Sequence, residues 1–244
     1  MQEEIKELNP LGYKPIGKLL KSLAIPAIIA NLVNALYNVV DQIFIGQGIG
    51  YLGNAATNIA FPITTMCLAI GLTLGIGGAS NFNLELGKGY PEKSKHTAGT
   101  AASTLIIIGI ILCISVRIFL EPLMISFGAT DKILEYSMEY TGITSYGIPF
   151  LLFSIGVNPL VRADGNAKYS MIAIVIGAIL NTILDPLFMF VYNWGIAGAA
   201  WATVISQVVS ALLLLIYFPR FKSVKFSLND FIPQLHYLKR IISL

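Results

Sequence analysis

The sequence predicts an all-α polytopic membrane protein, built as a bundle of six transmembrane helices. The chain has 244 residues, of which 55% are hydrophobic and 12% charged, and its mean hydropathy is +0.73. Soluble domains carry about 25% charged residues, so this composition is typical of a chain that lies largely in lipid. The hydrophobic residues form long continuous runs without period-2 alternation, which favours helices over a membrane barrel.

Six of these runs are long enough to cross a bilayer, since a spanning helix needs about 20 apolar residues. The predicted spans are 19–45, 55–82, 98–120, 135–161, 169–192 and 195–218. Most connections between them are short. Two are longer: a charged cytoplasmic turn around residues 87–91, and residues 121–132, which we expect to be an outer loop that begins near Pro122.

The spans divide the chain into three parts. Residues 1–18 are expected to form a cytoplasmic N-terminal segment without a cleavable signal peptide. Residues 19–219 form the six-helix transmembrane lobe. Residues 220–244 are expected to be a cytoplasmic linker and the start of a second lobe, because their apolar positions have helical spacing but form no run that could span.

Basic residues predict the orientation, because cytoplasmic loops carry an excess of Lys and Arg. With the N-terminus inside, all but two of the 16 Lys and Arg residues fall on the inner side, and the exceptions are Arg117 and Lys132. We therefore expect a multi-pass protein of the plasma (inner) membrane with both termini of this chain cytoplasmic. The net charge of +3 reflects this bias and does not indicate a nucleic-acid partner.

The first predicted helix carries a stripe of polar residues at membrane depth. Asn31, Asn34, Asn38 and Asp41 are three or four residues apart and so share one face, with Tyr37 beside them. Buried amides also serve as hydrogen-bonding contacts between helices. A carboxylate at this depth costs roughly 2.5–3.5 kcal/mol or more, and such groups mark ion or substrate paths.

The fifth and sixth predicted helices supply matching polar groups. Asn181 and Asp185 are four residues apart and lie on one helix face. Pro186 removes a backbone donor and predicts a kinked or unwound turn, which would offer carbonyl oxygens to a cation. Thr203 and Gln207 share a face of the sixth helix. Oxygen ligands of this kind suit a proton or Na⁺, and two acidic residues at depth indicate cation-coupled transport.

Other features favour packing or turns. Pro26 predicts a kink in the first helix, and the glycines of the second helix permit close helix contact. The sequence Arg-Ala-Asp-Gly-Asn at 162–166 is interpreted as a solvated charged turn. Cys67 and Cys113 lie in apolar runs and are expected to be core residues.

No sequence feature indicates an enzyme. The chain lacks a phosphate-binding glycine loop with its Lys, a nucleophile elbow, and any cysteine or histidine spacing of a disulfide framework or metal site. We expect no cofactor other than a coupling ion.

Five segments together resemble the multidrug and toxic compound extrusion (MATE) family of transporters. They are Ile-Pro at 25–26, Leu-Tyr-Asn-Val-Val-Asp at 36–41, Arg-Ala-Asp-Gly-Asn at 162–166, Asn-Thr-Ile-Leu-Asp-Pro at 181–186, and Gly-Ile-Ala-Gly-Ala-Ala-Trp-Ala-Thr at 195–203. The similarity covers about residues 15–244. Members of the family have twelve helices in two six-helix lobes, so the resemblance implies that this chain is the N-terminal lobe.

The resemblance implies a cation site formed by Asp41, Asn181, Asp185 and Thr203. It also places two further residues in the supporting network, Tyr140 and Asn158. Such a protein would export cationic aromatic drugs or other toxic organic cations from the bilayer or the cytoplasm in exchange for a proton or Na⁺. It would need a C-terminal lobe or a second copy as its partner.

Two alternatives stay open at this stage. One is a lipid-linked oligosaccharide flippase of the same superfamily, although such a cavity should carry basic residues for pyrophosphate, and the ionisable residues predicted at depth are acidic. The other is a non-transporting membrane partner protein, which has little reason to hold buried aspartates and should tolerate their loss.

Overall fold

The structure is a computed structural model that describes residues 15–243, so most of the predicted N-terminal segment lies outside the described residues. The elements, in order, are α2 (Ile16–Gly48), α3 (Tyr51–Gly87), α4 (Pro91–Ile118), α5 (Leu120–Ser126), α6 (Asp131–Thr144), η2 (Ser145–Gly147), α7 (Ile148–Ala163), α8 (Ala167–Pro186), η3 (Leu187–Val191), α9 (Gly195–Tyr217), η4 (Phe218–Arg220), η5 (Leu228–Phe231) and α10 (Leu235–Ile242).

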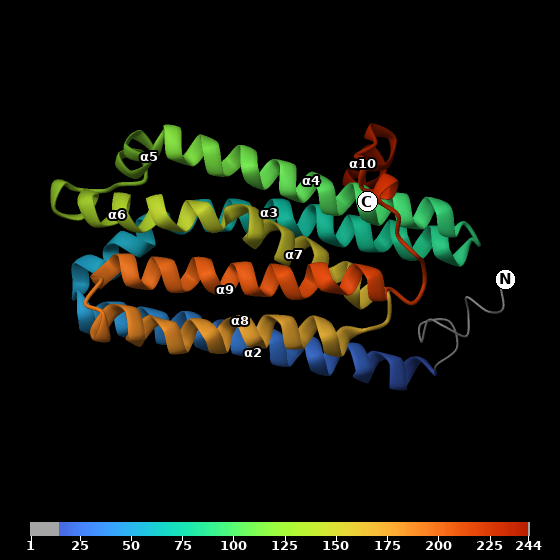
Figure 1. Ribbon diagram of the computed structural model, residues 1–244, viewed down its shortest axis with the longest axis horizontal. Helices are drawn as coiled ribbons and strands as arrows, with labels where there is room; N and C mark the ends of the chain where they lie inside the picture. The colour runs from blue at the N-terminus through green and yellow to red at the C-terminus, as the bar shows by residue number, and fades with distance from the viewer. Residues whose placement is uncertain (1–14, 244) are drawn as a thin grey trace.

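Six helical segments of the described chain are long and apolar enough to cross a membrane, which confirms the predicted number of spans. They lie side by side as long, roughly parallel rods (Figure 1). The end of the bundle that carries Ile16, Gly87 and Pro91 also carries α10, and we call it the terminal end. The opposite end, which carries α5, is called the loop end. The chain is therefore a multi-pass membrane protein.

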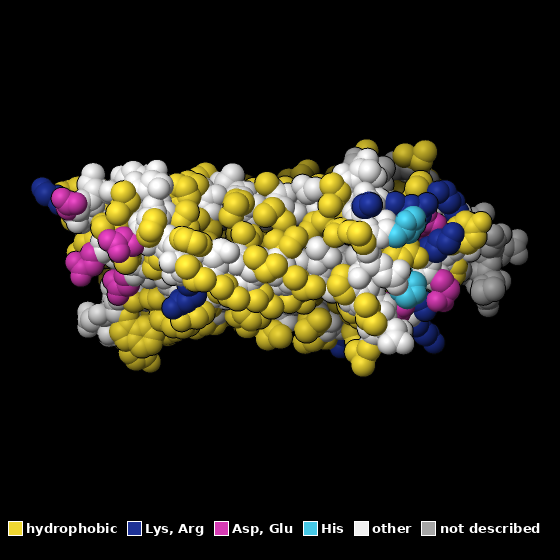
Figure 2. Space-filling model, turned by 90° about the horizontal axis from the view of Figure 1, so that it is seen from above, with side chains coloured by type: hydrophobic (Ala, Val, Ile, Leu, Met, Phe, Trp, Pro, Cys, Tyr) yellow, Lys and Arg dark blue, Asp and Glu magenta, His cyan; other side chains and the backbone are white. Residues whose placement is uncertain are grey.

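The surface agrees with this arrangement. Figure 2 shows hydrophobic side chains along the middle of the bundle and most of the charged side chains at its two ends. Lys and Arg side chains gather mainly at the terminal end, and Asp and Glu side chains are prominent at the loop end. The middle of the surface is suited to lipid tails, whereas both ends are suited to headgroups and water.

Two predicted elements differ from the structure. The fourth span is not one continuous helix, because α6 and α7 are separated by the 3₁₀ turn η2. Pro149 is the second residue of α7, and a Cβ at Gly147 would collide with the side chain of Gln207. The outer loop is also more regular than expected, since it contains the helix α5.

Close packing in the core depends on small residues. A Cβ on Gly75 of α3 would lie 2.6 Å from the carbonyl oxygen of Gly156 on α7, so these two backbones meet directly. Gly78 of α3 lies similarly close to Ala101 of α4. The glycines of the second span thus serve helix packing, as predicted. By contrast, α2 packs mainly against α8 and buries few of its residues.

The turn at 162–166 is not a solvated charged turn, because the side chain of Asp164 is fully buried. Its carboxylate accepts hydrogen bonds from the Tyr217 hydroxyl at 2.7 Å and from the backbone nitrogens of Lys222 and Ser223, each at 2.9 Å. Asp164 therefore fixes the chain where it leaves α9. The sequence interpretation failed because these donors lie more than fifty residues further along the chain.

Candidate functional site

Two acidic side chains from different helices meet inside the bundle. Asp41 lies on α2 and Asp185 lies on α8, and these two helices pack against each other. Both carboxylates are buried, with exposed fractions of 7% for Asp41 and 0% for Asp185. The two carboxyl groups are within hydrogen-bonding reach of each other. The structure therefore brings together the two residues that stood out most in the sequence.

Asn181 and Thr203 complete the predicted set of four. The Asn181 Nδ2 donates a hydrogen bond to Asp185 Oδ1 at 3.2 Å, and it lies 3.5 Å from Thr203 Oγ1 on α9. Three helices, α2, α8 and α9, thus contribute oxygen atoms to one buried place.

The backbone changes character immediately beyond this place. Helix α8 ends at Pro186 and continues as the π-helical turn η3. Proline lacks the N–H that an α-helix would use here, so a wider turn is a local consequence of the sequence. The predicted irregularity is present, although the chain stays helical rather than unwinding.

The carboxylate pair is short of hydrogen-bond donors. Among the described residues, no donor reaches Asp41 Oδ1, Asp185 Oδ2 or Asn181 Oδ1, although all three atoms are buried. Two ionised carboxylates only accept hydrogen bonds, so neither can satisfy the other unless a proton or a cation lies between them. Since buried polar atoms are nearly always paired, these oxygen atoms form a place suited to one added positive charge.

Two tyrosines lie near the pair. Tyr37 of α2 and Tyr140 of α6 both lie close enough to experience the charges of Asp41 and Asp185. Tyr140 also hydrogen-bonds with Thr203. The structure thus places Tyr140 beside the four predicted residues.

The remaining polar residues of α2 line its exposed side. Asn34 and Asn38 are exposed, and the Asn38 Nδ2 donates to the backbone oxygen of Asn34 at 2.7 Å. They extend the polar stripe from Asp41 toward the terminal end. Pro26 lies further along the same helix, and α2 runs through it without interruption.

Gln207 lies one helical turn beyond Thr203 on α9. Its side chain presses against Gly147 of the η2 break, and no donor within the described residues reaches its buried Oε1. It thus adds a buried oxygen without a donor to the part of α9 that follows Thr203.

Asn158 is not brought to the carboxylates. It exchanges two hydrogen bonds with Ser170: the Ser170 hydroxyl donates to Asn158 Oδ1 at 2.6 Å, and Asn158 Nδ2 donates to the Ser170 carbonyl at 3.1 Å. Ser170 and Asn181 are both on α8 and lie about 16 Å apart along its axis. Asn158 thus ties α7 to α8 nearer the terminal end.

Sequence reasoning missed Gln42 and Thr57. Gln42 hydrogen-bonds with Asp41, and the Thr57 hydroxyl of α3 donates to Gln42 Oε1 at 3.2 Å. These contacts link the pair to α3 as well. Gln42 could have been found because it follows Asp41 directly in the sequence, so its amide is well placed to contact that carboxylate. It was missed because it lies outside the polar stripe of α2.

Comparison with protein families gives a match over most of the chain. The MatE family model matches residues 26–187, a range that includes Asp41, Asn181 and Asp185. The chain belongs to the MatE family. Thr203 lies beyond the matched range, so its place in the site rests on the geometry. The resemblance seen in the sequence is confirmed.

Relatives of this MatE chain are longer than the chain itself. Multidrug export protein MepA of Staphylococcus haemolyticus is 27% identical over 209 residues, which cover 84% of this chain and 45% of MepA. MepA of Staphylococcus aureus is 26% identical over 213 residues, covering 87% of this chain and 47% of that protein. The chain thus spans about half the length of these relatives.

A solved structure shows the same relation. A multidrug resistance MATE family transporter of the MOP superfamily, in an outward-facing conformation, matches with a TM-score of 0.87 and 28% identity. The match covers 100% of this chain and 52% of that structure. The predicted six-helix membrane fold is therefore confirmed as one half of a MATE-type architecture.

Proposed function

We propose that this chain forms one lobe of a cation-coupled exporter of organic cations, with a proton or Na⁺ as the coupling ion. Its relatives named MepA are multidrug export proteins, which supports the export of drugs or toxic compounds. The chain corresponds to about half of each. The proposed transporter therefore contains a second six-helix lobe, supplied either by a C-terminal half or by a second copy.

The observation that carries this proposal is the carboxylate pair. Asp41 and Asp185 come from two helices, lie within hydrogen-bonding reach and each keep a buried oxygen without a donor. Two adjacent negative charges in a low-dielectric setting repel each other and have lost their hydration. An added proton or Na⁺ removes both penalties, which is the property that a coupling site needs.

The donor set fits a small hard cation. Asp41, Asp185, Asn181 and Thr203 supply carboxylate, amide and hydroxyl oxygens, and no sulfur or imidazole group is part of the set. Oxygen ligands suit hard cations, while thiolate and imidazole ligands suit transition metals. The same carboxylates can instead hold a proton, so both coupling ions fit the site.

Coupling follows from competition for the same negative charge. An organic cation bound near the ionised pair gains a counter-charge, and an arriving proton or Na⁺ removes it. The two ligands thereby oppose each other, with a coupling free energy that acts equally in both directions. If the coupling ion also favours one conformation of the bundle, its gradient drives release of the drug on the other side.

We also propose that the terminal end faces the cytoplasm, so that both ends of the described chain lie inside. This orientation is supported by the basic residues that gather there, following the positive-inside rule. The proposed location is the plasma membrane, across which export would clear the cell of the drug.

The first experiment measures ion binding by the chain itself. Purified protein is unfolded thermally in detergent with Na⁺ or with choline as the cation, and proton uptake is measured alongside. We expect Na⁺-dependent stabilisation or proton uptake, since a ligand that binds only the folded state stabilises it. Asp41→Asn and Asp185→Asn should each abolish the effect. Asp131→Asn, which changes an exposed acid at the loop end, should retain it.

Equal ion responses in the wild type and in both site variants would contradict the proposed site. Ethidium transport in proteoliposomes that contain only this chain then identifies the second lobe. Gradient-driven transport indicates two copies, while ion binding without transport indicates a requirement for a C-terminal lobe.

A further inference from the structure

The segment that follows α9 folds back along the flank of the bundle. Its helix α10 lies across α3 and α4 rather than beyond their ends (Figure 1). A Cβ on Gly77 would collide with the carbonyl oxygen of Ile241, and Asn81 Nδ2 donates to the Arg240 carbonyl at 3.0 Å. Gly77 lies about 15 Å along the axis from Gly87, the end of α3. The segment therefore lies where the apolar surface gives way to the polar end.

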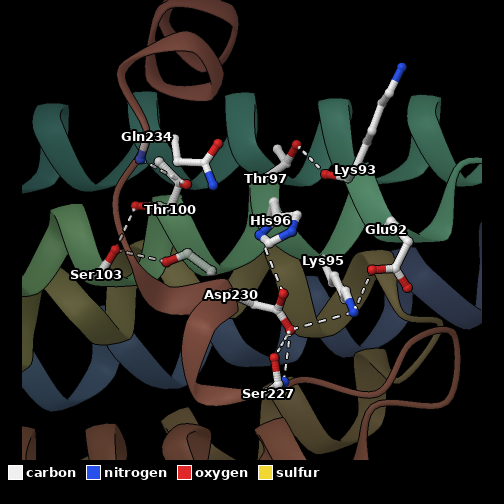
Figure 3. A network of polar contacts seen from close by, with 11 residues as sticks. Glu92, Lys93, Lys95, His96, Thr97, Thr100, Ser103, Ser227, Asp230 and Gln234 are labelled. Atoms are coloured by element: carbon white, nitrogen blue, oxygen red, sulfur yellow. Dashed lines mark hydrogen bonds and ion pairs between the residues drawn. The ribbon is translucent and has the colours of Figure 1, made fainter.

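Specific contacts hold the segment in this place. The backbone oxygen of Asp230 lies against Gly99 of α4, where a larger residue would collide with it. The Asp230 carboxylate accepts from the backbone nitrogen of Ser227 at 2.7 Å and lies 3.3 Å from His96 Nδ1 and 3.8 Å from Lys95 Nζ (Figure 3). The close contact at Gly99 and the contacts of the Asp230 carboxylate with Ser227, His96 and Lys95 indicate that this segment has a defined docking position on α4.

The acidic side chains near this docking position are already paired with donors or basic groups. Glu85 accepts a hydrogen bond from Arg240 at 2.9 Å, and Glu92 lies 2.6 Å from Lys95. Asp230 is held as described, and Asp164 accepts from the backbone beyond α9. Carboxylates at this end thus contribute little free negative charge to the surface.

Three basic side chains within residues 222–242 have no such partner. Lys222, Lys225 and Lys239 are exposed, and none of them has a carboxylate within ion-pair distance among residues 15–243. Figure 2 shows Lys, Arg and His side chains gathered with hydrophobic ones at this end of the molecule.

The same segment exposes large apolar side chains beside these lysines. Leu228 is 90% exposed, Leu235 67%, Ile232 59% and Ile242 58%. Meanwhile α10 turns Ile241 inward, where it is almost fully buried. A short helix anchored on one face, with apolar and basic groups on the other side, has the composition of a membrane-surface helix.

We propose that residues 222–242 form a binding surface for anionic phospholipids of the leaflet at the terminal end. Leu235, Ile242 and their apolar neighbours enter the boundary of the acyl region, and Lys222, Lys225 and Lys239 contact the lipid phosphates. Basic groups next to a spanning helix attract anionic headgroups within a Debye length of the surface. The occupant is a lipid because apolar and basic groups occur together at the depth where tails meet headgroups.

The test places a fluorescent reporter in the segment. Trp194→Phe and Trp201→Phe remove the two native tryptophans, and Leu235→Trp supplies a probe. The protein is reconstituted into phosphatidylcholine vesicles that contain brominated phosphatidylglycerol or brominated phosphatidylcholine, whose bromine atoms quench nearby tryptophan. A matched control carries Ile111→Trp on the exposed apolar side of α4, which is 55% exposed. Circular dichroism and size-exclusion elution verify the fold of every variant.

We expect brominated phosphatidylglycerol to quench the probe at 235 at least about fivefold more effectively than brominated phosphatidylcholine, because each nearby Lys strengthens attraction to an anionic surface by about that factor. The control at 111 should show no preference. Lys225→Gln together with Lys239→Gln should remove the preference at 235 and leave quenching by phosphatidylcholine in place. High salt should weaken the preference for phosphatidylglycerol in the same way.

Three results would overturn the proposal. Equal quenching by both lipids at 235 would show contact with lipid but no anionic site. A preference that survives the double Lys→Gln change would show that Lys225 and Lys239 do not form the site. Absence of quenching by either lipid at 235, with normal quenching at 111, would show that water or another protein surface covers the segment.

Discussion

Buried carboxylates occur in two regions of this bundle, and they are supplied with hydrogen-bond donors very differently. Near the terminal end, Asp164 accepts from one hydroxyl and two backbone nitrogens, and Asp230 accepts from Ser227 beside two basic side chains. In the middle of the bundle, Asp41 and Asp185 each retain a buried oxygen without a donor. Burial alone therefore does not distinguish these acids, whereas the supply of hydrogen-bond donors does.

The difference has a physical meaning. A carboxylate with a full set of donors is stable as an anion and holds neighbouring segments in place. A pair of carboxylates without enough donors is stable only when a cation or proton supplies the missing charge. The first arrangement serves the fold, and the second fits the exchangeable ion that we propose. The following predictions separate the two.

The largest effect is expected at the carboxylate pair. Asp41→Asn or Asp185→Asn should abolish gradient-driven ethidium transport by a transport-competent protein. Each change removes one of the two negative charges for which the drug and the coupling ion compete. The amount of folded protein should change little, since the amide relieves repulsion within the pair. The measurement is dye transport in proteoliposomes, normalised to folded protein by size-exclusion elution. Transport at the wild-type rate in both variants would refute the assignment.

A loss of stability is expected instead at Asp164. The change Asp164→Asn turns an amide nitrogen toward backbone N–H groups, so donors are left unpaired. We expect a destabilisation of about 3 kcal/mol, since hydrogen bonds to charged groups contribute about 1.5–3 kcal/mol each. Thermal unfolding in detergent measures it, with Asp131→Asn as the exposed control. An unfolding midpoint equal to that of the wild type would show that the buried contacts of Asp164 do not stabilise the fold.

Two buried asparagines that both contact polar groups of α8 allow a direct comparison of a site residue with a packing residue. Asn181→Ala removes the donor to Asp185 and should reduce transport about tenfold, the effect of losing roughly 1.4 kcal/mol of interaction with the ion site. Asn158→Ala leaves Ser170 unpaired and should lower stability by about 1–3 kcal/mol, with a smaller effect on transport. Both variants are compared in transport and unfolding assays. A stronger transport defect in Asn158→Ala would place that residue in the ion path after all.

The smallest effect is expected for Lys95→Gln. This residue pairs with Glu92, whose side chain is 74% exposed, and it lies 3.8 Å from Asp230. Asp230 keeps its hydrogen bonds from Ser227, so the loss should be below about 1 kcal/mol, as for most surface ion pairs. Unfolding measurements in low and high salt test this. A loss as large as that of Asp164→Asn would mean that charge pairing, rather than donor supply, stabilises these acids.

Much of the candidate site could be predicted from spacing alone. Residues three or four positions apart share a helix face, so the sequence suffices to group Asp41 with Asn38, and Asp185 with Asn181. The cost of a charge in lipid then makes each aspartate a functional candidate. Helix number was predictable for the same reason, since span length is set by the thickness of the bilayer.

Contacts between distant segments were not predictable. The donors to Asp164 come from the last residue of α9 and from the segment beyond it, and the partner of Asn158 is on the next helix. The sequence pattern specifies no register between helices. The η2 break has a similar origin, because it depends on how Gln207 of α9 presses against Gly147. The role of Gln42 was missed because one residue of displacement turns a side chain about 100° around the helix.

Helix α2 has a property that bears on movement within the membrane. Only Ala30, Asp41 and Ile45 of its 33 residues are buried in the described structure. For a helix in lipid, exchanging an apolar protein neighbour for an acyl chain changes the hydrophobic free energy very little. Small differences in van der Waals packing and the charge state of Asp41 therefore dominate the cost of shifting α2. The span that carries Asp41 is also the least buried of the six in the described structure, so an ion bound at the proposed site would act on the helix that the rest of this lobe holds least.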